Sequence, residues 1–258
     1  MQTPPAASTP VNIGAARLLI MMPTVPRKSG VSYVEKAAEA VIKQLVAKPT
    51  GAHFIVYQPR VDPASQSVKA KLLGTIERLG GGGVASVVSE PPDLTEPVYP
   101  SGYVHKEGLS PGKVAKQQTR DVVSMLRHAH GHCQRGAVRR VLVMEDDFVL
   151  CERGLAHLAR AVRRLDARNP KWATLRVGYG MNGVLLQCQD LPATTAYLTS
   201  QQIMMPVDLL TDEWHMRSTG LGQAHFTPDR QAYFLRYNLL LHIGSVSNFE
   251  GRAKRSQP

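Results

Sequence analysis

Three consecutive carboxylates, Glu145, Asp146 and Asp147, are the residues of this sequence that are best suited to binding a cation. They follow the apolar run 141–144, which predicts a short strand buried on both faces. Adjacent negative charges at the edge of an apolar layer repel one another and lose hydration, which a divalent cation offsets. Mg²⁺ and Mn²⁺ prefer oxygen ligands, and ligands of open α/β sheets bind beyond the carboxyl ends of strands. The pattern predicts either a metal site or a solvated acidic turn that caps the next helix.

Four histidines are possible further ligands. His242 lies near the end of the apolar run 237–244, where a lone histidine is either a hydrogen-bonded core residue or a metal ligand. His128, His130 and His132 alternate near the end of a predicted helix, which predicts a solvated turn rather than a metal-binding helix.

Strands and helices alternate along the chain, which predicts a single α/β domain with a mostly parallel sheet. The predicted strands are 17–22, 51–57, 84–88, 141–144, 172–177 and 237–244. The predicted helices are 33–45, 67–79, 113–130, 154–168 and two that begin near 190, with Asp190 as the cap, and near 206. Segment 178–183 reads as a flexible turn, 1–16 as a disordered lead, 17–251 as the folded domain, and 252–258 as a basic tail.

The composition describes an ordinary globular protein with a strong positive charge. Of 258 residues, 43% are hydrophobic and 20% charged, and the formal net charge is +11. Such a charge attracts an anionic partner, or it reflects arginines and lysines that solvate helix faces. Aromatic residues are sparse and not interleaved with the basic ones, which argues against a platform for single-stranded nucleic acid.

Three widely spaced cysteines, Cys133, Cys151 and Cys188, form no CxxC pair and therefore indicate neither a zinc site nor a disulfide framework. One bridge is possible, and free buried thiols are the default expectation. No apolar run approaches the ~20 residues that span a bilayer, and the N-terminus lacks the pattern of a signal peptide. We therefore expect a soluble chain without a transmembrane segment.

Several short motifs occur together in an order typical of one family. They are 23–27 followed by 32–33, then 89–92, 118–121, 145–147, 190–191, 206–208 and 242–247, with Trp172 between them. Together they resemble the catalytic domain of N-acetylglucosaminyltransferase IV, which branches N-glycans. The resemblance spans about 17–254. A related group, the transferases that add N-acetylgalactosamine to GPI anchors, has a similar acidic motif.

The resemblance implies a glycosyltransferase A fold, a UDP-sugar donor such as UDP-GlcNAc, Mn²⁺ (or Mg²⁺) as cofactor, a glycan or glycolipid acceptor, and location in the Golgi or secretory lumen. It makes Asp147, Asp146 and His242 the expected metal ligands. Inversion at the anomeric carbon needs a carboxylate that takes the acceptor's proton, and Asp208 or its runner-up Asp212, one helical turn apart, could serve. The expected donor-binding residues are Thr24, Arg27, Gln118, Asp121, Glu145 and Asp146.

The chain also departs from the family pattern. The family has a membrane anchor before the catalytic domain and a sugar-binding module after it, and neither is expected here. Segment 180–183 replaces a more apolar family segment where acceptor recognition is expected, so the acceptor stays open. Two alternatives to an enzyme are an inactive relative that binds sugar nucleotides or glycans, and a basic interaction module whose acidic strand end is only structural.

Overall fold

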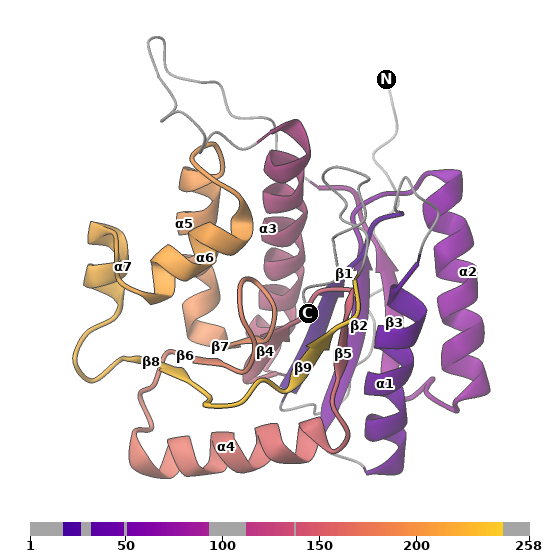
Figure 1. The fold of residues 1–258 in the computed structure, drawn as a ribbon, viewed down its shortest axis with the longest axis horizontal. Coiled ribbons are helices and arrows are strands. Elements are labelled where there is room, and N and C mark those ends of the chain that lie inside the picture. The colour runs from indigo at the N-terminus through magenta and orange to yellow at the C-terminus, as the bar shows by residue number, and fades with distance from the viewer. Residues whose placement is uncertain (1–17, 27–31, 49–50, 93–111, 137, 245–258) are drawn as a thin grey trace, which may run out of the picture.

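The computed structural model describes residues 18–26, 32–48, 51–92, 112–136 and 138–244 (Figure 1). The predicted lead at 1–16, the basic tail at 252–258 and the expected donor contact Arg27 lie outside these residues. None of the described helices is both long enough and apolar enough to cross a membrane.

The core of the described fold is one large sheet with a mixed strand direction. Its seven strands are β1 (Leu18–Pro23), β2 (Ala52–Gln58), β3 (Ala85–Ser89), β4 (Arg140–Val143), β6 (Thr174–Arg176), β7 (Val184–Gln187) and β8 (Ala232–Phe234). They lie in the order β3-β2-β1-β4-β7-β6-β8, and only β7 runs antiparallel to its neighbours. The predicted fold class, an α/β domain with a mostly parallel sheet, is confirmed.

Helices cover both faces of this sheet (Figure 1). They are α1 (Val34–Ala47), α2 (Pro63–Arg78), α3 (Lys113–Gln134), α4 (Gly154–Arg168), α5 (Leu191–Gln201), α6 (Val207–His215) and α7 (Gly220–His225). α1, α2 and α4 contribute to one apolar cluster, and α3, α5 and α6 to the other. The result is a three-layer arrangement with a core on each side of the sheet.

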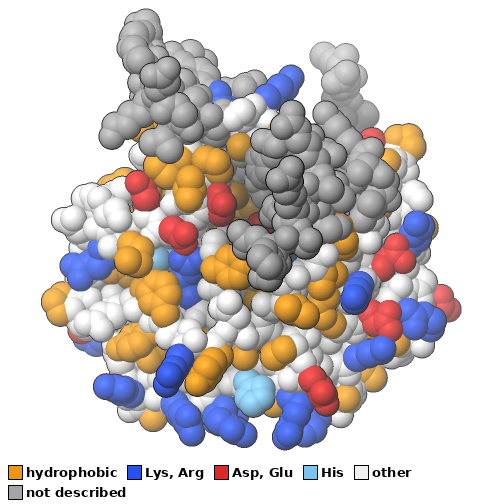
Figure 2. Space-filling view, in the orientation of Figure 1, with side chains coloured by type: hydrophobic (Ala, Val, Ile, Leu, Met, Phe, Trp, Pro, Cys, Tyr) orange, Lys and Arg blue, Asp and Glu red, His pale blue; other side chains and the backbone are white. Residues whose placement is uncertain are grey.

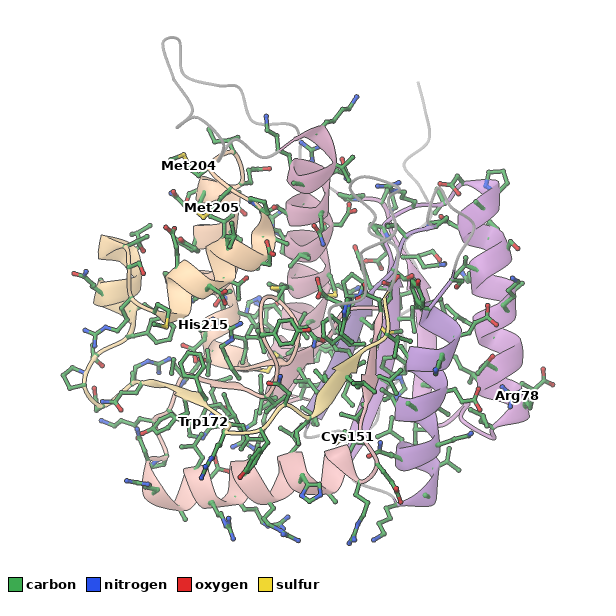
Figure 3. The ribbon with its side chains drawn as sticks, in the orientation of Figure 1. Arg78, Cys151, Trp172, Met204, Met205 and His215 are labelled. Carbon is green, nitrogen blue, oxygen red and sulfur yellow. A yellow bond between two sulfur atoms is a disulfide. The ribbon has the colours of Figure 1, made fainter. Side chains whose placement is uncertain are left out.

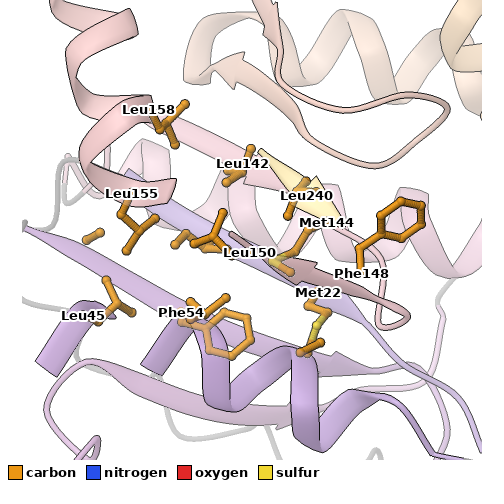
Figure 4. Packing of buried hydrophobic residues seen from close by; sticks show 14 of the residues in the cluster. Met22, Leu45, Phe54, Leu142, Met144, Phe148, Leu150, Leu155, Leu158 and Leu240 are labelled. Atoms are coloured by element: carbon orange, nitrogen blue, oxygen red, sulfur yellow. The ribbon is translucent and has the colours of Figure 1, made fainter. Parts of the chain in front are cut away.

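Alternation along the strands divides the apolar side chains between the two cores. On β1, Ile20 and Met22 face the α1 side, while Leu19 and Met21 face the α3 side. Figure 4 shows Met22 and Leu142 of the α1-side cluster together with Leu155 of α4. Because both faces are buried, most strands are continuous apolar runs. These runs allowed most of the strands to be predicted from the sequence.

A second, two-stranded sheet lies over the α1-side core. β5 (Phe148–Leu150) pairs antiparallel with β9 (Leu240–His242), and Phe148 lies opposite His242. Sequence reasoning missed β5, β7 and β8, and it placed 237–244 in a single longer strand. Short strands of three or four residues leave too little periodicity to be recognised without their partners.

Helix α2 begins at Pro63, four residues before the predicted start at position 67. The missed signal is Asp62, whose side chain accepts a hydrogen bond of 2.8 Å from the Ser65 backbone N–H, with proline at the first helical position. Asp190, predicted to cap α5, makes no side-chain cap; its carboxylate instead binds Arg230 and lies 3.0 Å from His225 Nε2.

Two of the three cysteines form a disulfide, so the default expectation of free thiols is wrong for them. Cys133, near the end of α3, is bonded to Cys188, which follows β7. Only Cys151 keeps a free thiol, and it is half-buried. A separation of 55 residues hides this pairing from sequence spacing.

The expected solvated turn at 128–132 is also wrong, because all three histidines lie within α3. His132 is buried, and its Nε2 lies 3.3 Å from Nε2 of His128. Glu90 in turn contacts His128 Nδ1 at 2.9 Å. Burial lowers the pKa of His132 to about 4, so the His132 imidazole is neutral at physiological pH.

Candidate functional site at the carboxyl edge of β1 and β4

The strand order reverses between β1 and β4. From β1 the chain continues outward through β2 and β3, then returns to place β4 on the other side of β1. In open α/β sheets, ligands bind beyond the carboxyl ends of the strands at such a switch point. Thr24 follows β1 there, and Glu145–Asp147 follow β4. Their side chains meet, because Thr24 Oγ1 donates a hydrogen bond of 2.6 Å to Asp146 Oδ2.

Backbone bonds hold the acidic turn from several sides. Met144 N–H donates to the carbonyl of Met21 in β1 at 3.0 Å. The N–H of Glu145 donates to the Asn182 side-chain oxygen at 3.2 Å. On the other side, Ile243 N–H donates to the Asp147 carbonyl at 2.9 Å. The backbone of the turn is therefore held in place, while the side chains of Glu145 and Asp147 stay partly exposed.

His242 lies beside Asp147, as the metal-ligand interpretation expected. Its Nε2 is 3.4 Å from Asp147 Oδ2, and the two side chains are 27% and 18% exposed. The imidazole also packs on Phe148, with 4.7 Å between ring centroids. His242 is therefore a partly exposed side chain between a core aromatic ring and a carboxylate. A side chain at Gly244 would overlap Asp147 Oδ2 and come within 2.9 Å of His242 Nε2, so glycine is needed for this approach.

The donor atoms fit a divalent cation that keeps several positions open. Ligand atoms about 2.1 Å from an octahedral ion lie roughly 3 Å apart, close to the separation of Asp147 Oδ2 and His242 Nε2. Over the described ranges, no group of three or more His, Cys, Asp or Glu side chains converges in a way that could hold a metal. Two possible ligand atoms, Asp147 Oδ2 and His242 Nε2, therefore lie together, and the neighbouring Asp146 is buried and bonded to Thr24.

Tyr179 is an aromatic residue of the site that sequence reasoning did not single out. Its ring is 54% exposed and meets the Phe148 ring edge-on, with 5.5 Å between centroids. Partial burial raises the pKa of its phenol, and the charges of Asp147 and Glu145 raise it further. The phenol therefore lies close to the acidic turn and stays protonated.

The predicted turn at 178–183 is present, and Gly178 and Gly183 within it are closely packed. Gly183 has φ +73°, and a Cβ there would lie 2.6 Å from the Gly178 nitrogen and 2.9 Å from Leu240. Asn182 is fully buried and supplies the oxygen that binds Glu145 N–H. The glycines permit a tight loop, so they do not indicate mobility here.

Two of the three carboxylates of α6, Asp208 and Asp212, have different surroundings. Asp208 is exposed, and its Oδ1 accepts a 2.9 Å bond from Leu209 N–H at the start of the helix. Asp212 instead forms an ion pair with Arg176, whose side chain is 5% exposed and which also donates to the Gly180 carbonyl. Sequence reasoning missed Arg176, although a lone charge within the apolar run 172–177 was a usable signal.

The expected donor-binding residues on α3 lie near the carboxyl end of β2. Asp121 is buried and accepts a 2.7 Å hydrogen bond from the Gln117 side chain. Burial raises the pKa of Asp121 to about 6, while Gln117, Arg60 and Arg120 oppose the rise. Arg60 follows β2, and its positive charge acts to lower the pKa of Asp121. Gln118 is half-buried on the same helix. The structure thus places both residues on the helix beside β1.

The sequence matches no protein-family model and no curated protein. Solved structures match over much of their length at low identity. A cytidylyltransferase from Leptospira borgpetersenii has a TM-score of 0.47 and 9% identity, covering 89% of this chain and 82% of its own. A glycosyltransferase involved in glycosylating the PBCV-1 major capsid has a TM-score of 0.46 and 11% identity. The alignment covers 91% of this chain and 96% of that one.

A third similar structure is a mannosyltransferase from Pyrobaculum calidifontis in complex with GDP-Man and Mn²⁺. It has a TM-score of 0.41 and 12% identity, and the alignment covers 75% of this chain and 55% of that one. The arrangement of this α/β domain thus resembles that of glycosyltransferases and a nucleotidyltransferase. With identities and TM-scores this low, the argument for function rests on the residues of the site.

Proposed function

We propose that this chain is a metal-dependent, inverting glycosyltransferase that uses a nucleoside-diphosphate sugar, with UDP as the nucleotide. The observation that carries the proposal is the fixed acidic turn 145–147 at the β1/β4 switch point, with Asp147 beside His242. An anionic donor can bind next to three carboxylates only if a cation compensates the charge. The proposed cofactor is Mn²⁺, or Mg²⁺, held by Asp147 and His242, with Asp146 as a further predicted ligand.

When bound, the cation would neutralise charge on the departing diphosphate. The chain's own residues orient the reactants around that position. Glu145 and Asp146 with Thr24 form the floor of the site, and Gln118 and Asp121 on α3 offer hydrogen bonds to the uracil or ribose. Asp121 has its pKa raised to about 6, so it accepts such a bond as a carboxylate at neutral pH.

Asp208 is proposed as the general base. Its carboxylate is exposed. Asp208 also lies against the loop that carries Tyr179, since a Cβ built on Gly180 would be 3.5 Å from the Asp208 Cβ. Asp208 takes the proton from the acceptor hydroxyl while the new C–O bond forms at the anomeric carbon and the diphosphate leaves. Asp212 is less suited to this role, because Arg176 already occupies its carboxylate.

Two more specific proposals concern the donor sugar and the cellular compartment. The family resemblance supports an N-acetylhexosamine donor such as UDP-GlcNAc and a glycan or glycolipid acceptor. The Cys133–Cys188 disulfide supports an oxidising compartment such as the secretory lumen, because structural disulfides persist there.

The test is a panel of nucleotide sugars assayed for binding and hydrolysis with and without Mn²⁺. We expect Mn²⁺-dependent UDP affinity, metal-dependent hydrolysis of at least one UDP-sugar, and loss of both in Asp147→Asn. Asp229→Asn is the matched control, since Asp229 is an exposed carboxylate that pairs with Lys171. UDP binding without hydrolysis would indicate an inactive relative. UDP affinity that is independent of Mn²⁺ in the wild type would refute the proposal.

A further inference from the structure

The outer face of α4 is unusually basic. Arginines at 153, 160, 164 and 168, with His157, follow the three- and four-residue spacing of a single helix face, and Arg163 lies on its flank. All six side chains are exposed. In Figure 2, Lys and Arg side chains line the lower edge of the molecule, where Figure 1 places α4. We call this surface the α4 arginine face.

The arginines of this face are not engaged in local ion pairs. Over the part of the chain that the structure describes, none of the five forms a salt bridge. The only acidic residue within α4, Asp166, is turned to other partners: it accepts bonds of 2.8 and 2.9 Å from Arg140 and one of 2.8 Å from the Trp172 indole. Glu152, just before the helix, is the one acidic side chain next to the face in sequence. The guanidinium charges are therefore largely uncompensated.

Hydrogen bonds and buried side chains at both ends of α4 hold the helix in place, so the face is rigid. At its first turn, Leu155 N–H donates to Gln44 Oε1 at 3.0 Å, and Gln44 Nε2 donates to the Cys151 carbonyl at 2.9 Å. Leu155 and Leu158 are buried beneath it. Trp172, which holds the far end through Asp166, lies above α4 in Figure 3. A 15-residue helix is about 22 Å long, which gives a straight row of charge.

From this geometry we infer that the α4 arginine face docks the domain on an anionic lipid bilayer. Guanidinium groups bind phosphate oxygens in a bidentate manner, and each basic residue near an anionic membrane adds to the attraction. α4 packs lengthwise on the domain through Leu155 and Leu158, so its arginines form one exposed row along the edge of the molecule (Figure 1). α4 also has no Phe, Tyr or Trp that could stack on a base.

The experiment measures sedimentation with vesicles of 70% phosphatidylcholine and 30% phosphatidylserine, with pure phosphatidylcholine vesicles as reference. We expect binding to the anionic vesicles at 50 mM NaCl and its loss at 1 M NaCl, where the Debye length falls to about 3 Å. The triple variant R160Q/R164Q/R168Q should bind roughly 100-fold more weakly, since each basic residue near such a surface contributes about fivefold.

The matched control is K36Q/K71Q/R78Q, which removes the same charge from α1 and α2. There Lys71 lies 3.9 Å from Glu35 and Arg78 3.4 Å from Glu39, so that face carries both signs. The control should keep nearly all of the wild-type binding. Equal losses in the two triple variants, or no wild-type binding to anionic vesicles, would overturn the inference. Stronger binding to duplex DNA than to vesicles at equal phosphate concentration would also overturn it, in favour of a nucleic-acid partner.

Discussion

The proposed donor and acceptor sides of the candidate site are built differently. On the proposed donor side, the acidic turn 145–147 is a contiguous motif whose backbone is held by β1, Asn182 and Ile243. On the proposed acceptor side, α6 and the loop 178–183 are joined by one buried arginine, Arg176, which binds both Asp212 and the Gly180 carbonyl. The donor side therefore depends on many backbone bonds, whereas the acceptor side depends strongly on one buried charge.

The largest expected effect tests Asp208, one of the three acidic residues of α6, as the general base. Asp208→Asn should lower the rate of sugar transfer by about 10²–10⁴, the usual cost of removing a general base. Its UDP affinity with Mn²⁺ and its thermal stability should match the wild type, because the side chain is exposed. The measurement is kcat for donor hydrolysis or transfer beside calorimetric UDP binding. Near wild-type kcat in this variant would remove Asp208 from the role of base.

The next effect concerns stability rather than chemistry. Asp212→Ala leaves the guanidinium of Arg176, which is almost fully buried, without its partner. Leaving a buried polar group unpaired costs about 1–3 kcal/mol, and solvent partly screens this pair because the Asp212 side chain is 44% exposed. The free energy of unfolding should therefore fall by about 1–3 kcal/mol. Urea denaturation measures it, with Asp208→Ala as the matched control on the same helix. A loss below about 1 kcal/mol in Asp212→Ala would show that Arg176 finds other partners.

Acid should weaken the acceptor side through His215, which Figure 3 marks on α6. Burial and, to a lesser extent, the charge of Arg176 together lower the pKa of His215 to about 3. The unfolded state binds a proton below pH ~6.5 that the native state does not bind until about pH 3. The free energy of unfolding therefore falls as pH drops through this window, by about 2 kcal/mol from pH 6.5 to 5 for this residue.

The control for that effect is His215→Leu, which removes the titrating group from the same buried position. Its urea-unfolding free energy, whatever its value at pH 7, should depend less on pH between 6.5 and 5 than that of the wild type. Identical pH slopes in the two proteins would assign the acid sensitivity to other groups, such as His53 and His132, whose pKa values burial lowers to about 4.

The smallest effect tests the donor side. Gly244→Ala adds a methyl group where it would overlap Asp147 Oδ2 and crowd His242 Nε2. We expect Mn²⁺-dependent UDP binding to weaken by about tenfold, since displaced ligands around a metal commonly cost 10–100-fold. Gly220→Ala is the control, because a Cβ at Gly220 meets nothing within 4 Å. An unchanged Mn²⁺ requirement in Gly244→Ala would argue that Asp147 and His242 do not share a cation.

Local signals in the sequence determined a large part of this protein. The apolar runs of β1, β2 and β4 needed only their own residues to be recognised, because strands buried on both faces are continuously apolar. The bounds of α4 were predicted correctly from its amphipathic pattern and flanking residues. The acidic turn was likewise visible as three adjacent carboxylates after a strand.

Only the tertiary structure decided which distant residues meet. Thr24 reaches Asp146 across 122 positions, Cys133 reaches Cys188 across 55, and Arg176 reaches Asp212 across 36. Each of these pairings depends on the order of strands in the sheet and on the packing of helices against it, neither of which a residue's neighbours in sequence encode. The chain determined its elements locally because propensity and burial act over a few residues; long-range packing decided which side chains of the site are joined.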